Sequence, residues 1–214
     1  MRSITNNFTR SVGVVLLAAG SSRRMERPKL LLPWGDTSII GQQVRTWQNL
    51  GAGQVAIVLA GDSALAKELD RINFAATNRI SNPVPHEGMF SSIRCAARWT
   101  GWKVALTHWA ITLGDQPHLR VETLQSLLAC AATQPSKISQ PLCHGHFRHP
   151  VILPEAIFAR LASTEAATLK NFLVSAPEGI AGCQTDDPGL DQDIDTPADY
   201  QRALALYNSP PKIP

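Results

Sequence analysis

Short apolar runs alternate along the chain with segments of helical period. Five runs, at 12–19, 54–60, 108–114, 137–142 and 149–154, predict strands, and several are apolar throughout, as is typical of strands covered on both faces. Between these runs, apolar residues at helical spacing predict helices with the faces Ile40, Val44, Trp47 and Leu50; Val121, Leu124 and Leu128; and Tyr200, Ala203, Leu204 and Tyr207. Because strands separated by helices form right-handed crossover units, the pattern predicts a three-layer α/β fold with a mostly parallel central sheet.

The last predicted helix has a start signal in "DTPADY". Thr196 is placed to cap the helix, Pro197 suits its first turn, and Asp199 lies where the carboxylate of a capping box is expected. Asp193 and Asp195 stand just before this start, in a stretch whose alternate residues share a face if the chain is extended.

Composition and charge limit the classes of protein that the sequence allows. The chain has 214 residues, 44% hydrophobic and 17% charged, enough to bury a substantial core. We expect one domain over 12–207, with flexible tails at 1–11 and 208–214. A net charge of +3 is too weak a field to predict nucleic acid or an anionic membrane as the main partner. The polar first eleven residues, and apolar stretches that are all shorter than a membrane span, predict a cytoplasmic protein.

The four cysteines are scattered along the chain without a Cys-x-x-Cys pair. They are Cys95, Cys130, Cys143 and Cys183. This spacing favours neither a disulfide framework nor a thiolate metal site. It predicts partly buried thiols in a reducing compartment.

The stretch "VVLLAAGSSRRMERPKLLLPWG" (14–35) leaves the first predicted strand through Gly20 and then gathers hydroxyls and cations. A glycine at that point allows a positive φ and lets backbone N–H groups approach an anion, and Ser22, Arg24 and Lys29 add donors and positive charge. The loop has neither the Gly-Lys-Ser/Thr of a Walker A motif nor the Gly-x-Gly-x-x-Gly dinucleotide turn. It predicts a phosphate-binding loop, with a solvated basic loop as the alternative.

These residues carry a resemblance to a known family. "LAAGSSRRMERPKLLLP" resembles the signature of nucleotidyltransferases with a Rossmann-like fold, above all the molybdenum cofactor cytidylyltransferases and their guanylyltransferase relatives. "GMFSSIRCA", "LGDQPHL", "HPVILP" and "DQDIDTPADY" resemble further motifs of that family in the same order. Together the matches span 12–207, and the combination of Leu-Gly-Asp-Gln-Pro with Asp-Ile-Asp-Thr-Pro is typical of the molybdopterin branch.

Nucleotidyl transfer brings together only anionic partners, so its catalysis consists mainly of charge neutralisation and positioning. Asp115, on the turn after a predicted strand, is placed to hold Mg²⁺, with a helix N-cap as the alternative. The resemblance implies Asp193 as the second metal ligand, with Asp195 able to serve instead or to orient it. Either carboxylate alternatively compensates the nearby helix N-terminus. Arg24 and Lys29 match the family signature and are expected to hold the triphosphate.

The resemblance also implies where the nucleoside and the acceptor bind. Backbone groups of Leu17, Ala18, Ala19 and Gly20 are expected at the base, and Gly88, Ser91 and Ser92 resemble the segment that lines the nucleotide pocket. A serine pair opening a helix is also an ordinary cap. His149 belongs to the His-Pro-Val motif, whose strand faces the acceptor, and is expected to help bind the pterin phosphate.

The run "HGHFRH" raises a competing hypothesis, a zinc site at His144, His146 and His149. We reject it because no cysteine or carboxylate is recognised near them at metal spacing and His149 is accounted for by the motif. The chain also departs from the family pattern. Glu26 and Arg148 replace glycines, and "STEAATLKNFL" (163–173) lacks the glycine and arginine of the usual helix start, so the acceptor side has changed more than the triphosphate side.

The sequence thus predicts a Mg²⁺-dependent transferase that joins CMP from CTP to molybdopterin and releases pyrophosphate. The alternatives are a guanylyltransferase that uses GTP, nucleotidyl transfer to another phosphorylated acceptor, and a binding protein with little turnover. The last would hand molybdopterin to a molybdenum hydroxylase apoprotein, which is also the expected macromolecular partner.

Overall fold

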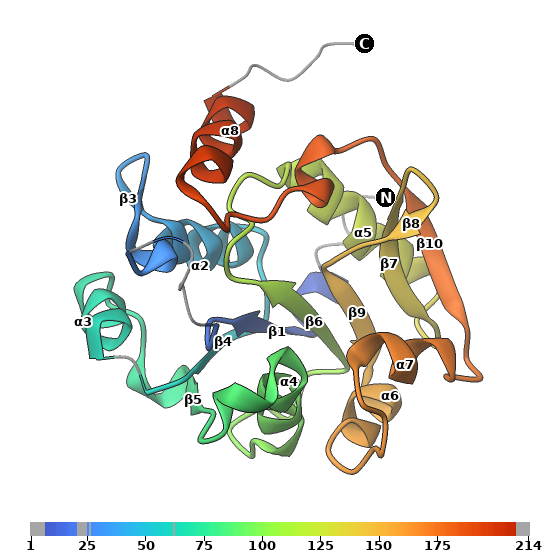
Figure 1. Ribbon diagram of the computed structural model, residues 1–214. Helices are drawn as coiled ribbons and strands as arrows, with labels where there is room; N and C mark the ends of the chain where they lie inside the picture. The colour runs from blue at the N-terminus through green and yellow to red at the C-terminus, as the bar shows by residue number, and fades with distance from the viewer. Residues whose placement is uncertain (1–6, 21–24, 26, 62, 209–214) are drawn as a thin grey trace.

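The computed structural model describes residues 7–20, 25, 27–61 and 63–208. Within them lies a sheet of eight strands in the order β10 (Ile180–Gln184), β7 (Ile138–Cys143), β9 (Val151–Pro154), β6 (His108–Leu113), β1 (Val12–Leu17), β4 (Gln54–Leu59) and β5 (Arg79–Ser81), with β8 (His146–Phe147) paired to β7. Parallel pairs join β1 to β4 and β6, β4 to β5, and β7 to β10, whereas β9 is antiparallel to both neighbours. The mostly parallel sheet that the sequence predicted is confirmed (Figure 1).

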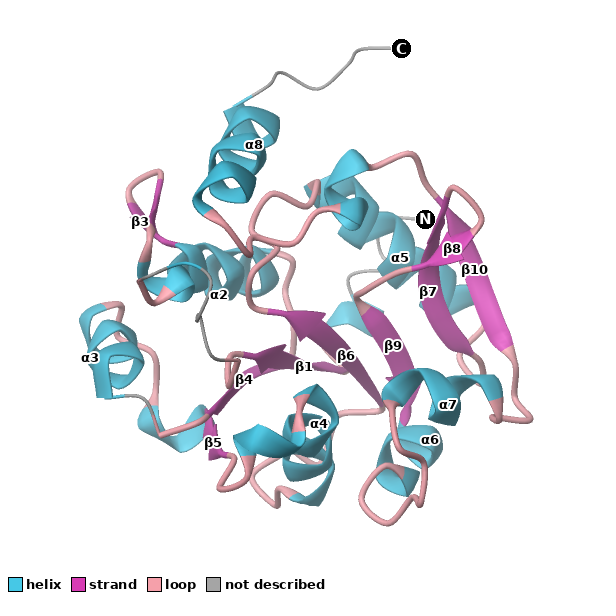
Figure 2. Cartoon of the chain, in the orientation of Figure 1, coloured by secondary structure: helices cyan, strands magenta, loops and turns pink. Residues whose placement is uncertain are grey.

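The central strands are apolar because helices cover both faces of the sheet. Along β1, Val12, Val14 and Leu16 pack in one core cluster and Val15 packs in the other, and every residue of β4 is buried. One cluster takes side chains from α2 (Ile39–Asn49), α3 (Ser63–Arg71), α5 (Val121–Thr133) and α8 (Pro197–Asn208); the other takes them from α4 (Met89–Arg98), α6 (Glu155–Arg160) and α7 (Leu169–Val174). Figure 2 shows this three-layer arrangement, which confirms the predicted α/β fold.

Shorter elements connect these layers. They are η2 (Lys29–Leu31), the hairpin of β2 (Pro33–Trp34) and β3 (Thr37–Ser38), η3 (Ala76–Asn78), η4 (Pro85–Glu87) and η5 (Pro188–Asp191). The predicted capping box at the start of α8 is confirmed. The Thr196 N–H donates to Asp199 Oδ2 at 2.8 Å, and the Asp199 N–H donates to Thr196 Oγ1 at 3.2 Å. This reciprocal pair fixes the point at which the preceding acidic segment enters the helix.

The cysteine prediction is wrong for two of the four residues. Cys130 on α5 and Cys183 on β10 form a disulfide, with their Cα atoms 6.4 Å apart, while Cys95 and Cys143 are free thiols. The sequence spacing gave no sign of the bridge because α5 and β10 come together only by packing at one end of the sheet.

The predicted tails are described only in part. Of the tails predicted at 1–11 and 208–214, residues 1–6 and 209–214 lie outside the described residues. Residues 7–11 pack against the sheet, since Thr9 is buried and the Phe8 ring lies 4.7 Å from the His108 ring. None of the helices in the described part of the chain has the length and apolarity needed to cross a membrane.

Candidate active site

The candidate site begins where β1 and β6 end side by side. Leu17 and Leu113 are partners in the parallel register, so the loop after β1 and the turn after β6 leave the sheet together. The Gly114 N–H donates to the Leu17 carbonyl at 3.1 Å, and a Cβ atom on Gly114 would lie 2.8 Å from that oxygen. A glycine is required here, because any side chain would push the two strand ends apart and displace Asp115, the next residue.

Lys29, Asp115 and Asp195 meet at this edge from three distant parts of the chain. Lys29 Nζ lies 2.5 Å from Asp115 Oδ2 and 3.0 Å from Asp195 Oδ1. The Lys29 side chain is 14% exposed and the Asp115 side chain 17% exposed. Burial alone lowers the pKa of Lys29, but the charges and hydrogen bonds of Asp115 and Asp195 outweigh it and raise the pKa overall. The lysine therefore stays charged and offsets the two carboxylates.

Asp193 adds a third carboxylate to this edge. Its Oδ1 accepts a hydrogen bond of 2.9 Å from Gln116 Nε2, one residue beyond Asp115. Loss of hydration, and then repulsion from Asp115, raise the pKa of Asp193. Ile194 is fully buried between Asp193 and Asp195, so the acidic segment alternates as the sequence predicted. The structure brings together all three predicted metal ligands and Lys29.

Several buried polar residues that the sequence analysis missed position these groups. Gln43 Nε2 donates to the Leu113 carbonyl at 3.1 Å, which holds the end of β6. His118 Nε2 lies 3.1 Å from the carbonyl oxygens of both Gly189 and Gln192, which ties the acidic segment to the turn after β6. The sequence offered only weak signals for these two residues. Gln43 lies on the otherwise apolar face of α2, and His118 directly follows the "LGDQP" motif.

The first predicted loop is described only in part. Ser22 and Arg24 lie outside the described residues, as does Glu26. The Leu17 carbonyl and the Ala18 N–H bond within the sheet, to Gly114 and Val58 respectively, while Gly20 is exposed beyond them. Gly20 does not adopt the positive φ that a glycine allows, and an added Cβ atom there would meet no atom of the described residues within 4 Å.

The predicted nucleoside segment forms a buried hydrogen-bond network. Gly88 has a φ of 89° and precedes α4, which explains the glycine. Asn82 Nδ2 donates to the hydroxyls of Ser91 and Ser92 at 2.8 and 2.9 Å, and Ser91 Oγ donates to the Gly88 carbonyl at 2.8 Å. The serine hydroxyls thus shape the loop from within, and Gly88 is the predicted residue that stays exposed.

His149 is the residue that the sequence analysis expected at the acceptor. It follows the β7–β8 hairpin, and its Nδ1 is 3.3 Å from the Ile111 carbonyl oxygen. Desolvation lowers the pKa of His149, so the ring is neutral at neutral pH. Nearby, Arg148 pairs with Asp191, its Nη2 lying 2.5 Å from Oδ1. In the other altered motif, Thr168 caps α7 by accepting from the Asn171 N–H at 3.1 Å.

A cysteine and a carboxylate do lie next to His144, contrary to the prediction from the sequence. His144 Nδ1 lies 3.4 Å from Cys143 Sγ and 3.1 Å from Asp191 Oδ2. The carboxylate comes from a segment 47 residues further along the chain, so sequence spacing could not reveal it. His146 is exposed on β8, and His149 bonds to the sheet instead.

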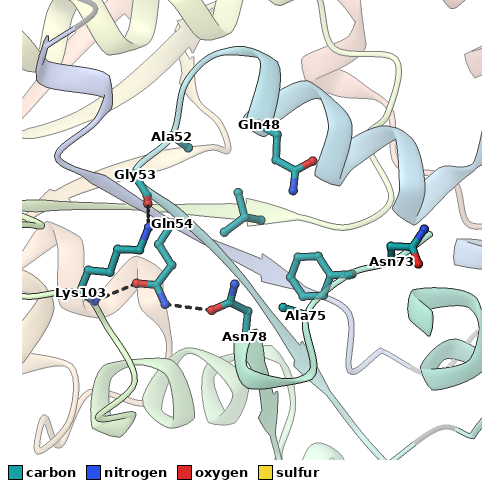
Figure 3. A pocket seen from close by; sticks show the side chains of 10 residues that line it. Gln48, Ala52, Gly53, Gln54, Asn73, Ala75, Asn78 and Lys103 are labelled. Carbon is teal, nitrogen blue, oxygen red and sulfur yellow. Dashed lines mark hydrogen bonds between the residues drawn. The ribbon is translucent and has the colours of Figure 1, made fainter. Parts of the chain in front are cut away.

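A separate pocket of about 270 Å³ lies at the opposite edge of the sheet, where β4 begins (Figure 3). The Gln54 side chain forms part of the pocket wall. Its Nε2 donates to Asn78 Oδ1 at 3.0 Å, and its Oε1 accepts from the Lys103 N–H at 2.8 Å. None of the predicted site residues lines this pocket. The carboxyl edge of β1 and β6 remains the candidate active site.

Comparison with known proteins agrees with this geometry. A family model described as MobA-like NTP transferase domain matches residues 14–179. The chain belongs to the MobA-like NTP transferase family. The resemblance stated from the motifs is therefore confirmed, and membership of the MobA-like family makes the protein a nucleotidyltransferase.

Two relatives that align with this MobA-like chain over nearly their whole length have different names. Nicotine blue oxidoreductase of Paenarthrobacter nicotinovorans is 28% identical over 200 residues, which cover 89% of this chain and 95% of that protein. Molybdenum cofactor cytidylyltransferase of Escherichia coli K12 is 20% identical over 199 residues, which cover 92% and 97%.

Solved structures share the fold of the MobA-like chain. An Rv0371c homologue from Mycobacterium sp. strain JC1 has a TM-score of 0.72 at 26% identity, covering 92% of this chain and 97% of that one. A manganese complex of Rv0371c from Mycobacterium tuberculosis H37Rv has a TM-score of 0.66 at 24% identity, covering 91% and 98%.

Proposed function

We propose that this nucleotidyltransferase transfers CMP from CTP to the phosphate of molybdopterin and releases pyrophosphate. The observation that carries the proposal is the meeting of Lys29 with Asp115 and Asp195 at the carboxyl edge of β1 and β6, next to Asp193. In a parallel α/β sheet this edge is where ligands bind. The relative named molybdenum cofactor cytidylyltransferase supports the choice of nucleotide and acceptor.

The carboxylates fit a hard divalent cation such as Mg²⁺. Asp115, Asp193 and Asp195 offer only oxygen donors, and loss of hydration, followed by repulsion from Asp115, raises the pKa of Asp193. A structural neighbour solved in complex with manganese supports the choice of a divalent ion. When bound, the ion would supply charge neutralisation at the phosphates.

The residues of the chain itself would position the reactants. An oxygen of the acceptor phosphate attacks the α-phosphorus, the bond to the β-phosphate oxygen breaks, and pyrophosphate leaves with the bonding electrons. Lys29 would offset the charge on the leaving group, together with Arg24, and the carboxylates would hold the metal. Ser22 and the backbone from Leu17 to Gly20 would contact the nucleotide, with Gly88, Ser91 and Ser92 shaping the pocket. His149 would donate or accept a hydrogen bond at the acceptor phosphate.

The proposal also covers the domain organisation, the location and the partner of the protein. We propose a single catalytic domain over 12–207, a cytoplasmic location and a molybdenum hydroxylase apoprotein as the partner that receives the product. The altered residues on the acceptor side, Arg148 with its Asp191 partner above all, make the acceptor the part of the proposal that most needs a direct test.

The first experiment is calorimetric titration with CTP, GTP and ATP, with and without Mg²⁺, combined with a pyrophosphate-release assay on molybdopterin. We expect Mg²⁺-dependent preference for CTP, and a loss of turnover of about a hundredfold or more in Asp115→Ala, because an essential charge-bearing group is removed. Asp36→Ala is the matched control, since Asp36 is exposed and forms its ion pair with Arg45, away from the candidate site.

Each other outcome points to a different function. Preference for GTP would support the guanylyltransferase alternative, and CTP binding without turnover on molybdopterin would point to another phosphorylated acceptor. Near-normal turnover in Asp115→Ala would contradict the proposed mechanism. Molybdopterin binding that is unaffected by Asp115→Ala, without turnover, would favour the binding-protein alternative.

A redox activity is the second candidate, because the full-length relative at 28% identity is named an oxidoreductase. It predicts binding of a flavin or nicotinamide nucleotide in place of a nucleoside triphosphate. The same titration with these cofactors distinguishes the two functions.

A further inference from the structure

A second cluster of potential metal ligands lies beside the candidate active site. Cys143 ends β7, His144 and Gly145 form the turn to β8, and Asp191 ends η5. The sulfur, a ring nitrogen and a carboxylate oxygen of Cys143, His144 and Asp191 all lie within 4.8 Å of one another. We refer to these three residues as the Cys–His–Asp cluster.

Two of the three separations match the edges of a tetrahedral zinc site. Zinc bonds of about 2.3 Å to sulfur and about 2.0 Å to nitrogen and oxygen separate sulfur from nitrogen by roughly 3.5 Å and nitrogen from oxygen by roughly 3.3 Å. The observed separations are 3.4 Å from Cys143 Sγ to His144 Nδ1 and 3.1 Å from His144 Nδ1 to Asp191 Oδ2. The histidine nitrogen therefore already lies at bonding-edge distance from both other donors, and the Cys143 sulfur and the Asp191 oxygen, within 4.8 Å of each other, would come to roughly 3.5 Å on sharing one ion.

The surroundings orient the donors and leave the cluster accessible. Arg148 binds Oδ1 of Asp191, with Nε at 2.7 Å, and so directs Oδ2 toward His144. An outer partner of this kind commonly fixes a carboxylate ligand. Cys143 is buried, whereas the side chains of His144 and Asp191 are 71% and 35% exposed. An ion can reach the cluster from solvent and keep one position open toward it.

We propose that Cys143, His144 and Asp191 form a zinc site with three protein ligands and a fourth position open to water or another small donor. On binding, the Cys143 thiol releases its proton to solvent and the thiolate coordinates the metal. Sulfur and imidazole donors favour zinc, whereas the all-oxygen set of Asp115, Asp193 and Asp195 favours magnesium. The zinc site goes beyond the proposed function, and its ligands are distinct from those proposed for the transfer reaction.

The test uses the full chain, stripped of metal by dialysis against a chelator. Zn²⁺ is titrated in competition with a chromophoric chelator, and Co²⁺ is added separately to record its spectrum. We expect one tight zinc site per chain that persists in excess Mg²⁺, and a thiolate-to-cobalt charge-transfer band. Because even outer-shell changes lower metal affinity by about 10–100-fold, Cys143→Ser and Asp191→Asn are each expected to weaken zinc binding by at least that factor.

Matched variants separate this site from general thiol or histidine binding. Cys95→Ser removes the other free thiol, and His146→Ala removes the neighbouring exposed histidine, so both are expected to bind zinc normally. His144→Asn removes the nitrogen ligand while keeping a residue that tolerates the φ of 49° at this position, which gives a test even if Cys143→Ser fails to fold.

The proposal is overturned if the stripped protein binds no zinc in competition with the chelator, or if Cys95→Ser abolishes the cobalt band while Cys143→Ser keeps it. Because Asp115 is not part of this cluster, Asp115→Ala is expected to keep zinc binding whether or not the proposed transfer reaction is correct.

Discussion

At the scale of single residues, the candidate site is a balance between Lys29 and a group of carboxylates. Lys29 bonds to Asp115 and Asp195, which lie 86 and 166 residues away in the sequence. Asp193 accepts a hydrogen bond from Gln116, a neutral donor, so its charge is the one least compensated of the three carboxylates. This residue should therefore report most directly on metal binding.

Asp193→Asn is expected to stabilise the metal-free protein while weakening Mg²⁺ binding. The folded-state pKa of Asp193 is raised, so its ionisation at neutral pH opposes folding, and removing the charge relieves that cost. Thermal unfolding in a chelator should show a higher Tm for the variant at pH 7, with the difference shrinking toward acid. Calorimetry should show Mg²⁺ affinity reduced by about tenfold or more.

The same reasoning gives the pH dependence of Mg²⁺ binding. In the wild type, affinity should fall as the pH is lowered through the raised pKa of Asp193, because the protonated carboxyl cannot bind the ion. In Asp193→Asn this dependence should weaken. Asp36→Asn is the control, and a variant curve that overlays the wild type would contradict the assignment of Asp193 as a ligand.

At the scale of elements, the segment from η5 to α8 positions the acidic residues through its own hydrogen bonds. Asp187, almost fully buried, accepts from the Arg120 and Gly189 N–H groups and from the Thr123 hydroxyl, and so joins the start of η5 to the start of α5. At the other end, the capping box of Thr196 and Asp199 fixes the start of α8, and Asp199 Oδ2 also accepts from the Asp195 N–H at 3.3 Å. The segment is held at both ends.

Thr196→Ala is expected to lower the free energy of unfolding by about 1 kcal/mol, because the Asp199 N–H loses its capping acceptor. The loss should also loosen Asp195 and raise the KM for the nucleotide. Thr196→Ser keeps the hydroxyl and should behave like the wild type in denaturant unfolding and in steady-state kinetics. Equal stability of Thr196→Ala and the wild type would show that the cap contributes nothing.

At the scale of the whole molecule, one end of the sheet depends on a covalent link. The edge strand β10 is held by β7 on one side and by the Cys130–Cys183 bridge to α5. The bridge spans a sequence separation of 53 residues, and constraining an unfolded chain over such a length typically stabilises the folded state by about 2–4 kcal/mol.

Reduction of the bridge is therefore expected to lower the free energy of unfolding by about 2–4 kcal/mol in guanidinium titrations. Cys130→Ser should match the reduced wild type and be insensitive to reductant, whereas Cys95→Ser should respond as the wild type does. Thiol titration of the unreduced, denatured protein should find the two free thiols, Cys95 and Cys143. Four reactive thiols before reduction would disprove the bridge.

Acid sensitivity is a second property of the whole molecule. Burial lowers the pKa of His108, His118 and His149. The unfolded chain then binds more protons than the folded one below pH about 6.5, so the free energy of unfolding should fall as the pH drops from 7 to 5. His118→Gln should reduce this slope in denaturant unfolding at several pH values, and His86→Gln, at an exposed position, should leave it unchanged.

The sequence by itself determined the fold class, the capping box of α8 and the candidate catalytic residues of the carboxyl edge. These features depend on local signals: apolar runs that must be covered on both faces, a capping pattern spanning four residues, and short motifs at strand ends. The shared face expected for Asp193 and Asp195 in an extended stretch agrees with the burial of Ile194 between them.

Only the tertiary structure decided which distant groups meet. The partners of Lys29, the Cys130–Cys183 bridge, the Cys–His–Asp cluster and the roles of Gln43, His118 and Asp187 all join residues that are dozens to more than a hundred positions apart. The physical reason is that strand order and helix packing bring such residues together, and no local pattern of charge or hydrophobicity encodes that order. The backbone of Gly20 shows the same limit, because the glycine permitted a positive φ and the packed strand end did not require one.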